Sequence, residues 1–220
     1  MVNFSTSEEN HIKTIFHLQQ KAETVTTNEL AEGLHTKPAS VTDMLKKLKA
    51  KKIVHYQPYQ GFRLTAEGEK QALSIIRRHR LWEYFLSEKL NFKWDEVHEV
   101  AEDLEHVSSS KLIERLDEFL GFPKFDPHGD PIPDNLGRVE ISHQQILTGT
   151  PLNKIVAVSQ IKNQTPALLD MLKHQQIQIG TKLEIKKRFP FDNSLEIKIR
   201  NKPAFTMSEQ QAQNIFVKHG

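Results

Sequence analysis

Two short helix-forming segments joined by a tight turn constrain the fold of this chain more than any other feature. Residues 26–28 (Thr-Thr-Asn) form a natural helix start before ELAEGL. Pro38 suits the first turn of a second helix, where its missing N–H is not needed, and Thr36 is placed to cap that helix. The intervening turn has His35 where glycine is common. Both helices carry apolar residues at a spacing that lets one pack on the other, namely Leu30, Ala31, Leu34, Val41, Met44, Leu45 and Leu48. The pattern predicts a helix-turn-helix.

The flanking segments extend this motif. Glu9–Gln20 has apolar residues at helical spacing, and IVHYQPYQGFRLT is typical of two short strands around a turn that contains Pro58 and Gly61. A further helix begins after Thr65. This order predicts a winged helix-turn-helix domain over residues 1–71, whose second helix enters the major groove of DNA.

The charge distribution agrees with this prediction, although the net charge is only +2. Residues 37–63 carry seven Lys or Arg against one acid, Asp43, whereas residues 94–118 carry nine acids against two basic residues. A charge run alone more often marks a solvated helix face, and a winged helix can also bind protein. The excess of six positive charges favours DNA. The candidate base readers are Ala39, Ser40 and Thr42 with Lys37 nearby, and the candidate phosphate contacts are Lys46, Lys47 and Arg63.

Two consecutive predicted helices carry His and Glu at spacings that put them on one face, namely His79 and Glu83 on the first helix and four residues on one stripe of the second. KQALSIIRRHRLWEYFLSEKL is predicted as one helix and WDEVHEVAEDLEHVSSSKLIERL as the next. A lone helical histidine is usually an ordinary residue, and Glu–His pairs also form simple salt bridges. The number of such residues favours a metal site, and carboxylate with imidazole suits Mn²⁺, Fe²⁺, Co²⁺ or Zn²⁺. The four residues on the stripe of the second helix are His98, Glu102, Glu105 and His106.

Several classes of protein are excluded or disfavoured. The chain has no cysteine, so disulfides and thiolate metal sites are excluded and a reducing cytoplasm is the expected location. No apolar run approaches the roughly 18 residues that a membrane span needs. A hydrolytic metalloenzyme is disfavoured because the sequence has no nucleophile elbow, phosphate loop or HExxH motif. We therefore expect neither an enzyme nor a small organic substrate.

The C-terminal part is predicted to form a small β domain. Residues 141–152 fall in a stretch without steady periodicity and are interpreted as a linker. KIVAVSQI, IGTKLEIKKRF and SLEIKIR alternate as strands do, PALLDMLKHQQI is a predicted helix, and FTMSEQQAQNIFV is a closing strand and helix. We expect an SH3-like barrel over residues 153–220, in which Leu168, Leu169 and Leu172 of the helix pack into the core. The fold class is thus mainly α with small β parts.

Residues 5–140 resemble the diphtheria-toxin-repressor and manganese-transport-regulator family of metal-dependent transcriptional repressors. The matching stretches are STSEENHIKTIFHL, ELAEGLHTKPASVTDMLKKL, GFRLTAEGE, RRHRLWEYFL, VHEVAEDLEHVSS and HGDPIP. The resemblance implies a helical dimerisation and metal-binding domain, placed at residues 72–140, and a homodimer formed mainly by helices between about 72 and 122. It also implies that the metal-loaded dimer binds a palindromic operator on double-stranded DNA.

The resemblance also implies which residues bind metal. Glu102, Glu105 and His106 match the regulatory site, and His79 matches a residue shared with that site or adjacent to it. Glu102 stands where the iron-responsive branch has cysteine and the manganese-responsive branch has glutamate, which favours Mn²⁺ over Fe²⁺, with Zn²⁺ or Co²⁺ able to substitute in vitro. Asn10 occupies the position from which the family supplies Met or Asp. The alternatives for that ligand are Glu8, Glu9 and His11.

A second metal site in the family corresponds to Glu83 and His98 together with groups from elsewhere. Asp126 and His128 occupy positions that hold cysteine and histidine in streptococcal-type manganese regulators. A partner from the third domain, usually acidic, aligns with Asn163 or Gln164. The rival hypothesis keeps the DNA-binding fold but has the dimer respond to a non-metal signal, with the acidic helix serving only as an interface.

Overall fold

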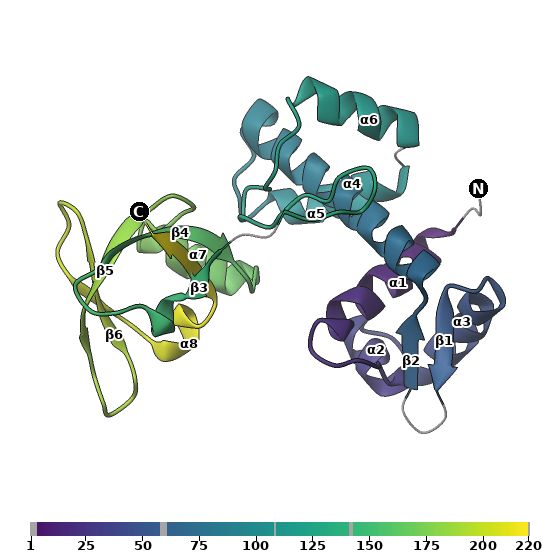
Figure 1. Cartoon of the computed structure of the whole chain (residues 1–220), viewed down its shortest axis with the longest axis horizontal. Coiled ribbons are helices and arrows are strands. Elements are labelled where there is room, and N and C mark those ends of the chain that lie inside the picture. Colours follow the sequence, from purple (N-terminus) through teal and green to yellow (C-terminus); the bar gives the residue numbers. More distant parts are fainter. Residues whose placement is uncertain (1–3, 58–60, 108, 141–142, 220) are drawn as a thin grey trace. The chain divides into compact units, whose positions relative to one another are not determined.

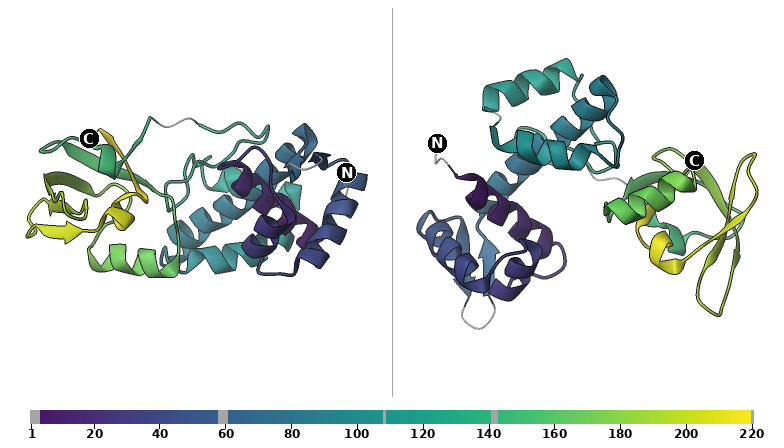
Figure 2. Two further views of the ribbon diagram at one scale, coloured as in Figure 1. Left: turned by 90° about the horizontal axis from the view of Figure 1, so that it is seen from below. Right: turned by 180° about the vertical axis from the view of Figure 1, so that it is seen from behind.

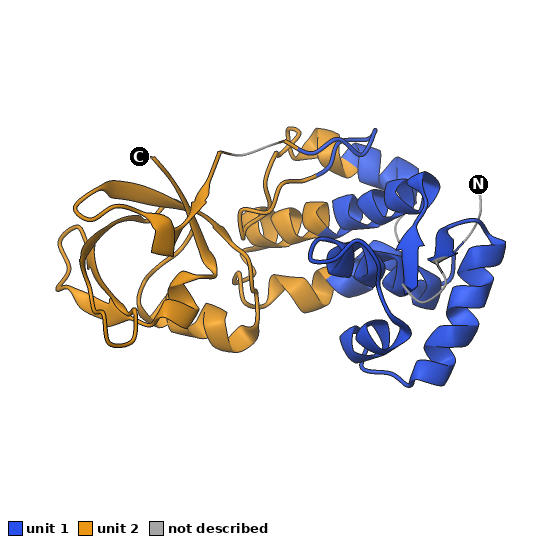
Figure 3. Ribbon diagram, turned by 60° about the horizontal axis from the view of Figure 1, so that its bottom comes forward, with its two compact units in different colours: residues 1–79, 102–115, 133–139 blue, residues 80–101, 116–132, 140–220 orange. Residues whose placement is uncertain are grey.

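The computed structural model describes residues 4–57, 61–107, 109–140 and 143–219 (Figure 1). Its contacts divide the chain into two compact units (Figure 3). The first comprises residues 1–79, 102–115 and 133–139, and the second comprises residues 80–101, 116–132 and 140–220. Helix accounts for 46% and strand for 19%, which confirms the mainly α fold class.

The first unit begins with three helices, α1 (Thr6–Gln19), α2 (Thr27–Gly33) and α3 (Pro38–Ala50). Capping boxes start the first two, between Ser5 and Glu8 and between Thr26 and Glu29, as the sequence around residues 26–28 predicts for α2. Pro38 occupies the first turn of α3, as predicted. The prediction that Thr36 caps α3 is wrong. Lys37 is the cap residue, and among the described residues no side chain bonds the first N–H groups of that helix.

The helix-turn-helix is confirmed. His35 has φ 50°, a conformation that glycine adopts without strain, and this explains why its position in the turn is an unusual one for histidine. The Thr36 N–H donates to the Ala31 carbonyl at 2.9 Å and closes the turn. Helices α1 to α3 share one core with the following strands, formed by Ile12, Ile15, Val25, Leu30, Ala31, Val41, Leu45, Leu48, Ile53, Val54, Leu64, Ala72 and Ile75. Leu34 and Met44 pack at its margin.

The wing consists of β1 (Val54–Gln57) and β2 (Gly61–Leu64), an antiparallel pair with Val54 opposite Leu64. Val25 extends this pair, because it exchanges two backbone hydrogen bonds of 2.8 Å with Phe62. Gly61 has φ 113°, and a Cβ there would lie 2.5 Å from the Val25 carbonyl oxygen, so the position requires glycine. The predicted turn residue Pro58 lies outside the described residues.

Three further helices follow, α4 (Ala66–Leu90), α5 (Val97–Val107) and α6 (Ser110–Phe119). Helix α4 is continuous through residue 71, where the sequence alone suggested a domain boundary. The segment read as one helix after residue 94 is two helices, which corrects that prediction. Ser109 explains the break, because its hydroxyl accepts a hydrogen bond from Leu112 N at 3.2 Å and so starts a new helix.

The C-terminal part of the second unit is a six-stranded antiparallel sheet that curls around one core. It contains β3 (Gln145–Ile146), the 3₁₀ helix η1 (Leu147–Gly149), β4 (Ile155–Ile161), α7 (Pro166–His174), β5 (Lys182–Arg188), β6 (Leu195–Ile199), β7 (Phe205–Met207), α8 (Glu209–Ala212) and β8 (Ile215–His219). The strand order is β3-β8-β4-β5-β6-β7. Helix α7, light green in Figure 2, buries Leu168, Leu169 and Leu172 in the core of this sheet, as predicted.

Within the segment interpreted as a linker, residues 141–152, the structure assigns residues 145–147 to this domain. β3 pairs with β8, and Leu147 of η1 is fully buried in the barrel core. Two residues are too few to give a strand period, so the sequence carried no signal for β3. Within the described residues, no helix is both long enough and apolar enough to cross a membrane.

Replacing Ala31 by leucine is expected to destabilise the first unit by about 1–3 kcal/mol, because overpacking a tight core strains it. Ala31 is 3% exposed and lies in the core that α2 shares with α3. Chemical denaturation followed by circular dichroism measures the effect. Ala50→Leu, at an exposed position of α3, is the matched control and should change stability by less than about 0.5 kcal/mol. Equal unfolding midpoints for the two variants would contradict the tight packing at Ala31.

Candidate metal centre and DNA-binding surface

The first candidate centre lies where α4 meets α5 in the first unit. His79, Glu102 and Glu105 each offer a ligand atom, and these atoms all lie within 4.8 Å of one another. His79 Nδ1 is 2.8 Å from Glu105 Oε2 and 3.8 Å from Glu102 Oε2. Glu102 and Glu105 share a face of α5 because they are three residues apart. The structure therefore brings together three of the four residues matched to the regulatory site.

His106, the fourth residue, lies beside this cluster. Its Nε2 is 3.4 Å from Glu105 Oε1, while its Nδ1 is 2.7 Å from Glu9 Oε2 on α1. Arg78 holds the other oxygen of Glu9 at 2.6 Å. A carboxylate on one ring nitrogen fixes the ring and leaves the other nitrogen available for a metal. Glu9 thus orients His106, with Nε2 on the side of Glu105.

Helix α1 carries all four residues proposed as the ligand that the N-terminal domain contributes to this centre, namely Glu8, Glu9, Asn10 and His11. Glu8 forms the capping box and an ion pair with Lys51 at 2.6 Å. His11 Nδ1 bonds the Ser7 carbonyl at 2.7 Å, and Glu9 is held as described above. Asn10 Oδ1 is buried and, within the part of the chain that the structure describes, has no hydrogen-bond partner. His11 Nε2 is likewise buried without a hydrogen-bond partner among the described residues, so Asn10 and His11 each have an unpaired atom to offer from α1.

Lys13 is a residue of the site that the sequence reasoning missed. Its ammonium lies 2.8 Å from Glu102 Oε2 and 2.6 Å from Glu105 Oε1. Burial raises the pKa of Glu105, but the His79 hydrogen bond and the Lys13 charge outweigh it, so this pKa lies below its ordinary value. A signal was present in the sequence, because Lys13 follows Glu9 by four residues and Asn10 by three, and so shares their helix face.

The donor atoms of this centre fit a divalent ion. The two carboxylates and the His79 imidazole converge, and His106 Nε2 lies 3.4 Å from Glu105 Oε1. Glu105 is fully buried, so its charge requires compensation by cations or hydrogen bonds. Among the described side chains, Asn10 Oδ1 and His106 Nε2 are buried atoms without a hydrogen-bond partner. Unsatisfied buried acceptors of this kind are what a coordinated ion would satisfy.

The second candidate centre lies in the second unit and groups Glu83 of α4 with Asp126 and His128, all three buried. Burial, followed by the charges of Asp130 and Glu83, raises the pKa of Asp126 well above its ordinary value. A cation between these carboxylates would relieve that repulsion, so the donor set fits a metal here too. His98, mostly exposed, contacts Glu83 Oε1 through Nδ1 at 3.2 Å.

A tight loop positions Asp126 and His128. Asp126 Oδ1 accepts hydrogen bonds from the N–H groups of His128 and Asp130, at 2.8 and 2.9 Å. Gly129, with φ 83°, lets this loop approach β4, since a Cβ there would lie 2.0 Å from the Ser159 carbonyl oxygen. His128 Nε2 lies 2.8 Å from the Trp94 carbonyl oxygen, with Nδ1 3.9 Å from Glu83 Oε1.

Asn163 and Gln164, the two positions aligned with the third-domain ligand, differ in their surroundings. Asn163 is exposed. Gln164 Nε2 instead donates to Asp130 Oδ2 at 2.5 Å, next to the loop. The amide at 164 therefore faces the loop as a hydrogen-bond donor.

The residues predicted to contact DNA lie on one exposed stretch of α3 and on β2. Lys37, Ala39, Ser40, Thr42, Lys46 and Lys47 are exposed, and Arg63 is half-buried. The Thr42 hydroxyl donates to the Pro38 carbonyl at 2.9 Å, and Lys46 pairs with Asp43 at 3.0 Å. Short side chains near the start of α3 and longer cations one to two turns later match the division into base readers and phosphate contacts.

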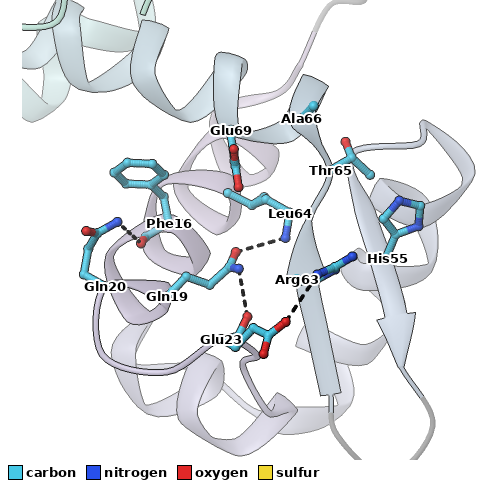
Figure 4. A pocket seen from close by; sticks show the side chains of 10 residues that line it. All are labelled: Phe16, Gln19, Gln20, Glu23, His55, Arg63, Leu64, Thr65, Ala66 and Glu69. Carbon is cyan, nitrogen blue, oxygen red and sulfur yellow. Dashed lines mark hydrogen bonds and ion pairs between the residues drawn. The ribbon is translucent and has the colours of Figure 1, made fainter. Parts of the chain in front are cut away.

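Arg63 also borders a hollow of about 480 Å³ between α1 and the wing (Figure 4). Arg63 Nη1 lies 3.4 Å from Glu23 Oε1. Gln19 Oε1 accepts from Leu64 N at 2.9 Å, and Gln19 Nε2 donates to the Glu23 carbonyl at 3.0 Å. These bonds attach the wing to α1, which gives the hollow a structural role.

Comparisons with known proteins match three families along the chain. Residues 3–62 match the iron-dependent repressor N-terminal DNA-binding domain, and residues 65–134 match the iron-dependent repressor metal-binding and dimerisation domain. Residues 147–219 match the FeoA domain. The last match begins at Leu147, in agreement with the place of that residue in the barrel core.

Individual relatives agree with these matches. An uncharacterised HTH-type transcriptional regulator of Methanocaldococcus jannaschii is 36% identical over 117 residues, which are 53% of this chain and 94% of that protein. The diphtheria toxin repressor of Corynebacterium efficiens is 25% identical over 191 residues, covering 80% of this chain and 81% of the relative. A manganese-dependent transcriptional repressor solved in complex with manganese has a TM-score of 0.85 and 31% identity, with 96% of this chain and 98% of that chain covered.

The winged helix, the carboxylate–imidazole centre and the three domain matches lead to one assignment. The relatives include an iron-dependent repressor of Mycobacterium leprae, 30% identical over 125 residues, as well as the manganese-dependent repressor, and in this chain the DNA-binding match precedes the metal-binding match. The chain belongs to the diphtheria-toxin-repressor and manganese-transport-regulator family of metal-dependent transcriptional repressors.

Proposed function

We propose that this protein is a Mn²⁺-dependent repressor that binds a palindromic operator as a homodimer and so controls metal-ion homeostasis, with Fe²⁺ as the alternative signal. The observation that carries the proposal is the cluster of His79, Glu102 and Glu105 directly against α1, a helix of the DNA-binding core. It places cation-binding atoms in contact with the part of the protein that carries α3.

Four residues would bind the ion at this centre: His79, Glu102, Glu105 and His106 through Nε2. Asn10 Oδ1 would complete the set from α1. A bound ion would supply positive charge to the carboxylates of Glu102 and Glu105, and Asn10 would contribute a ligand atom from α1. Because Ile12 and Ile15 of α1 are fully buried in the core shared with α3, holding α1 also fixes the DNA-reading helix.

Manganese is favoured by the chemistry of the ligands. Without cysteine, the centre offers only oxygen and nitrogen, and hard oxygen ligands from Glu102 and Glu105 suit Mn²⁺. Similar structures include repressors described as manganese-dependent, which supports the same ion here. The second centre of Glu83, Asp126 and His128 would take another divalent ion, with His98 at its edge.

A homodimer gives the protein two α3 helices, which matches an operator with two-fold symmetry. The match to a dimerisation domain over residues 65–134 supports this assembly. Such a repressor acts in the cytoplasm on double-stranded DNA and catalyses no reaction.

The proposal is tested by titrating the protein against DNA with Mn²⁺, Fe²⁺ and Zn²⁺ separately. We expect salt-dependent binding that each effective ion strengthens, with footprints of two-fold symmetry. DNA binding that does not depend on any of these ions would refute metal sensing and support the rival hypothesis of a non-metal signal.

Glu105→Gln should abolish most of the metal-stimulated DNA binding while leaving the fold intact. The substitution keeps the shape of the side chain but removes the charge at the centre of the cluster, and we expect Mn²⁺ affinity to fall by about 10- to 100-fold or more. Isothermal titration measures it. Asp103→Asn, at an exposed position of the same helix, is the control and should bind Mn²⁺ as the wild type does. Equal loss in both variants would contradict the assignment of Glu105.

Lys47→Ala should weaken binding to all DNA sequences alike, because an exposed α3 lysine that contacts phosphate carries no base information. We expect the slope of log affinity against log salt to fall by about 1. Binding to specific and unrelated duplexes at several salt concentrations measures this. Lys111→Ala, exposed on α6, is the control. An unchanged slope for Lys47→Ala would remove this residue from the interface.

A further inference from the structure

The ammonium of Lys13 contacts one oxygen of each carboxylate in the first candidate centre. The distances are 2.8 Å to Glu102 Oε2 and 2.6 Å to Glu105 Oε1. A divalent ion that takes oxygens from both carboxylates sits about 2.0–2.2 Å from each of them. The ion and the ammonium would then be only a few ångströms apart, and like charges at that separation repel strongly in a site with little water.

Both side chains of the Lys13–Glu105 ion pair are largely buried. The Lys13 side chain is 12% exposed, and that of Glu105 is fully buried. A buried carboxylate without a partner is strongly unfavourable, so Lys13 supplies the positive charge that Glu105 requires. A metal ion and the Lys13 ammonium therefore both compensate the negative charge of Glu102 and Glu105.

We propose that Lys13 is an internal competitor for the metal, whose ammonium holds Glu102 and Glu105 until a divalent ion displaces it. The competition raises the metal concentration at which the protein loads, and so sets the threshold of the response. This inference rests on the proposed metal-dependent function, since it concerns the regulation of the same centre.

The position of Lys13 on α1 ties this exchange to the DNA-binding core. Its neighbours in sequence and along the helix are Ile12, fully buried in that core, and Asn10, whose Oδ1 is buried. When the ammonium leaves the carboxylates, α1 loses one attachment to α5 and gains another through the ion. The exchange replaces a lysine ion pair by a metal bond at the same point of α1.

The test is the dissociation constant for Mn²⁺, measured by isothermal titration on the full chain. Lys13→Leu removes the charge and cannot coordinate metal, and we expect its Mn²⁺ affinity to rise by at least about tenfold. Lys13→Arg keeps the competing charge and should remain within a few-fold of the wild type. Lys51→Leu is the matched control, because it breaks a similar pair between α1 and another lysine, with Glu8 at 2.6 Å, and should not change the affinity.

Unchanged or weaker Mn²⁺ binding in a folded Lys13→Leu protein would overturn the inference, since a purely structural ion pair predicts that result. If Lys13→Leu does not fold, Lys13→Gln provides a neutral side chain that can still donate a hydrogen bond, and it should also bind Mn²⁺ more tightly. In the wild type, labelling with an amine-reactive reagent should modify Lys13 faster when Zn²⁺ is added, and an unchanged rate would count against displacement.

The two proposals fail separately. A wild-type protein that binds none of Mn²⁺, Fe²⁺ and Zn²⁺ overturns the metal-dependent function and the inference together. A wild-type protein that binds Mn²⁺ while Lys13→Leu gains no affinity overturns only the role of Lys13.

Discussion

The carboxylate of Glu105 is fully buried, and a buried charge is tolerated only when other charges and hydrogen bonds compensate it. His79 of α4 and Lys13 of α1 provide that compensation, at 2.8 and 2.6 Å. One side chain of α5 therefore holds elements that are more than twenty residues apart in the sequence. Removing Lys13 or His79 would leave the Glu105 charge without compensation in the protein interior. A cation that enters the centre can therefore replace one of these partners.

This sensitivity connects sensing with DNA reading. Glu9 and Lys13 of α1 contact residues of α5, whereas Ile12 and Ile15 of the same helix are buried in the core with α2 and α3. The polar face of α1 belongs to the metal centre and its apolar face to the DNA-binding core. When the polar contacts of α1 with α5 change, α1 transmits the change to α2 and α3, because its apolar face packs against them.

The sequence predicted much of the fold because the relevant signals are local. Helix spacing, the Thr26 cap and Pro38 determine α2 and α3, and strand alternation determines β4 to β6. The sequence predictions were wrong where an element is very short, and where a helix-capping residue interrupts an apolar pattern that otherwise continues at helical spacing. β3 has two residues, and Ser109 interrupts what periodicity alone reads as one helix. Thr36 looked like a cap, but Lys37 occupies that position.

The sequence by itself determined the types of ligand, because residues at i, i+3 and i+4 of a helix share a face wherever that helix lies, and because a chain without cysteine restricts the ligands to oxygen and nitrogen. Only the tertiary structure decided which groups meet. It placed Glu9 on His106, left Asn10 Oδ1 buried and unbonded within the described residues, and turned Gln164 rather than Asn163 towards the loop after α6. Above all it placed Lys13 between Glu102 and Glu105, since contacts across some ninety residues depend on how helices pack and leave no periodic trace in the sequence.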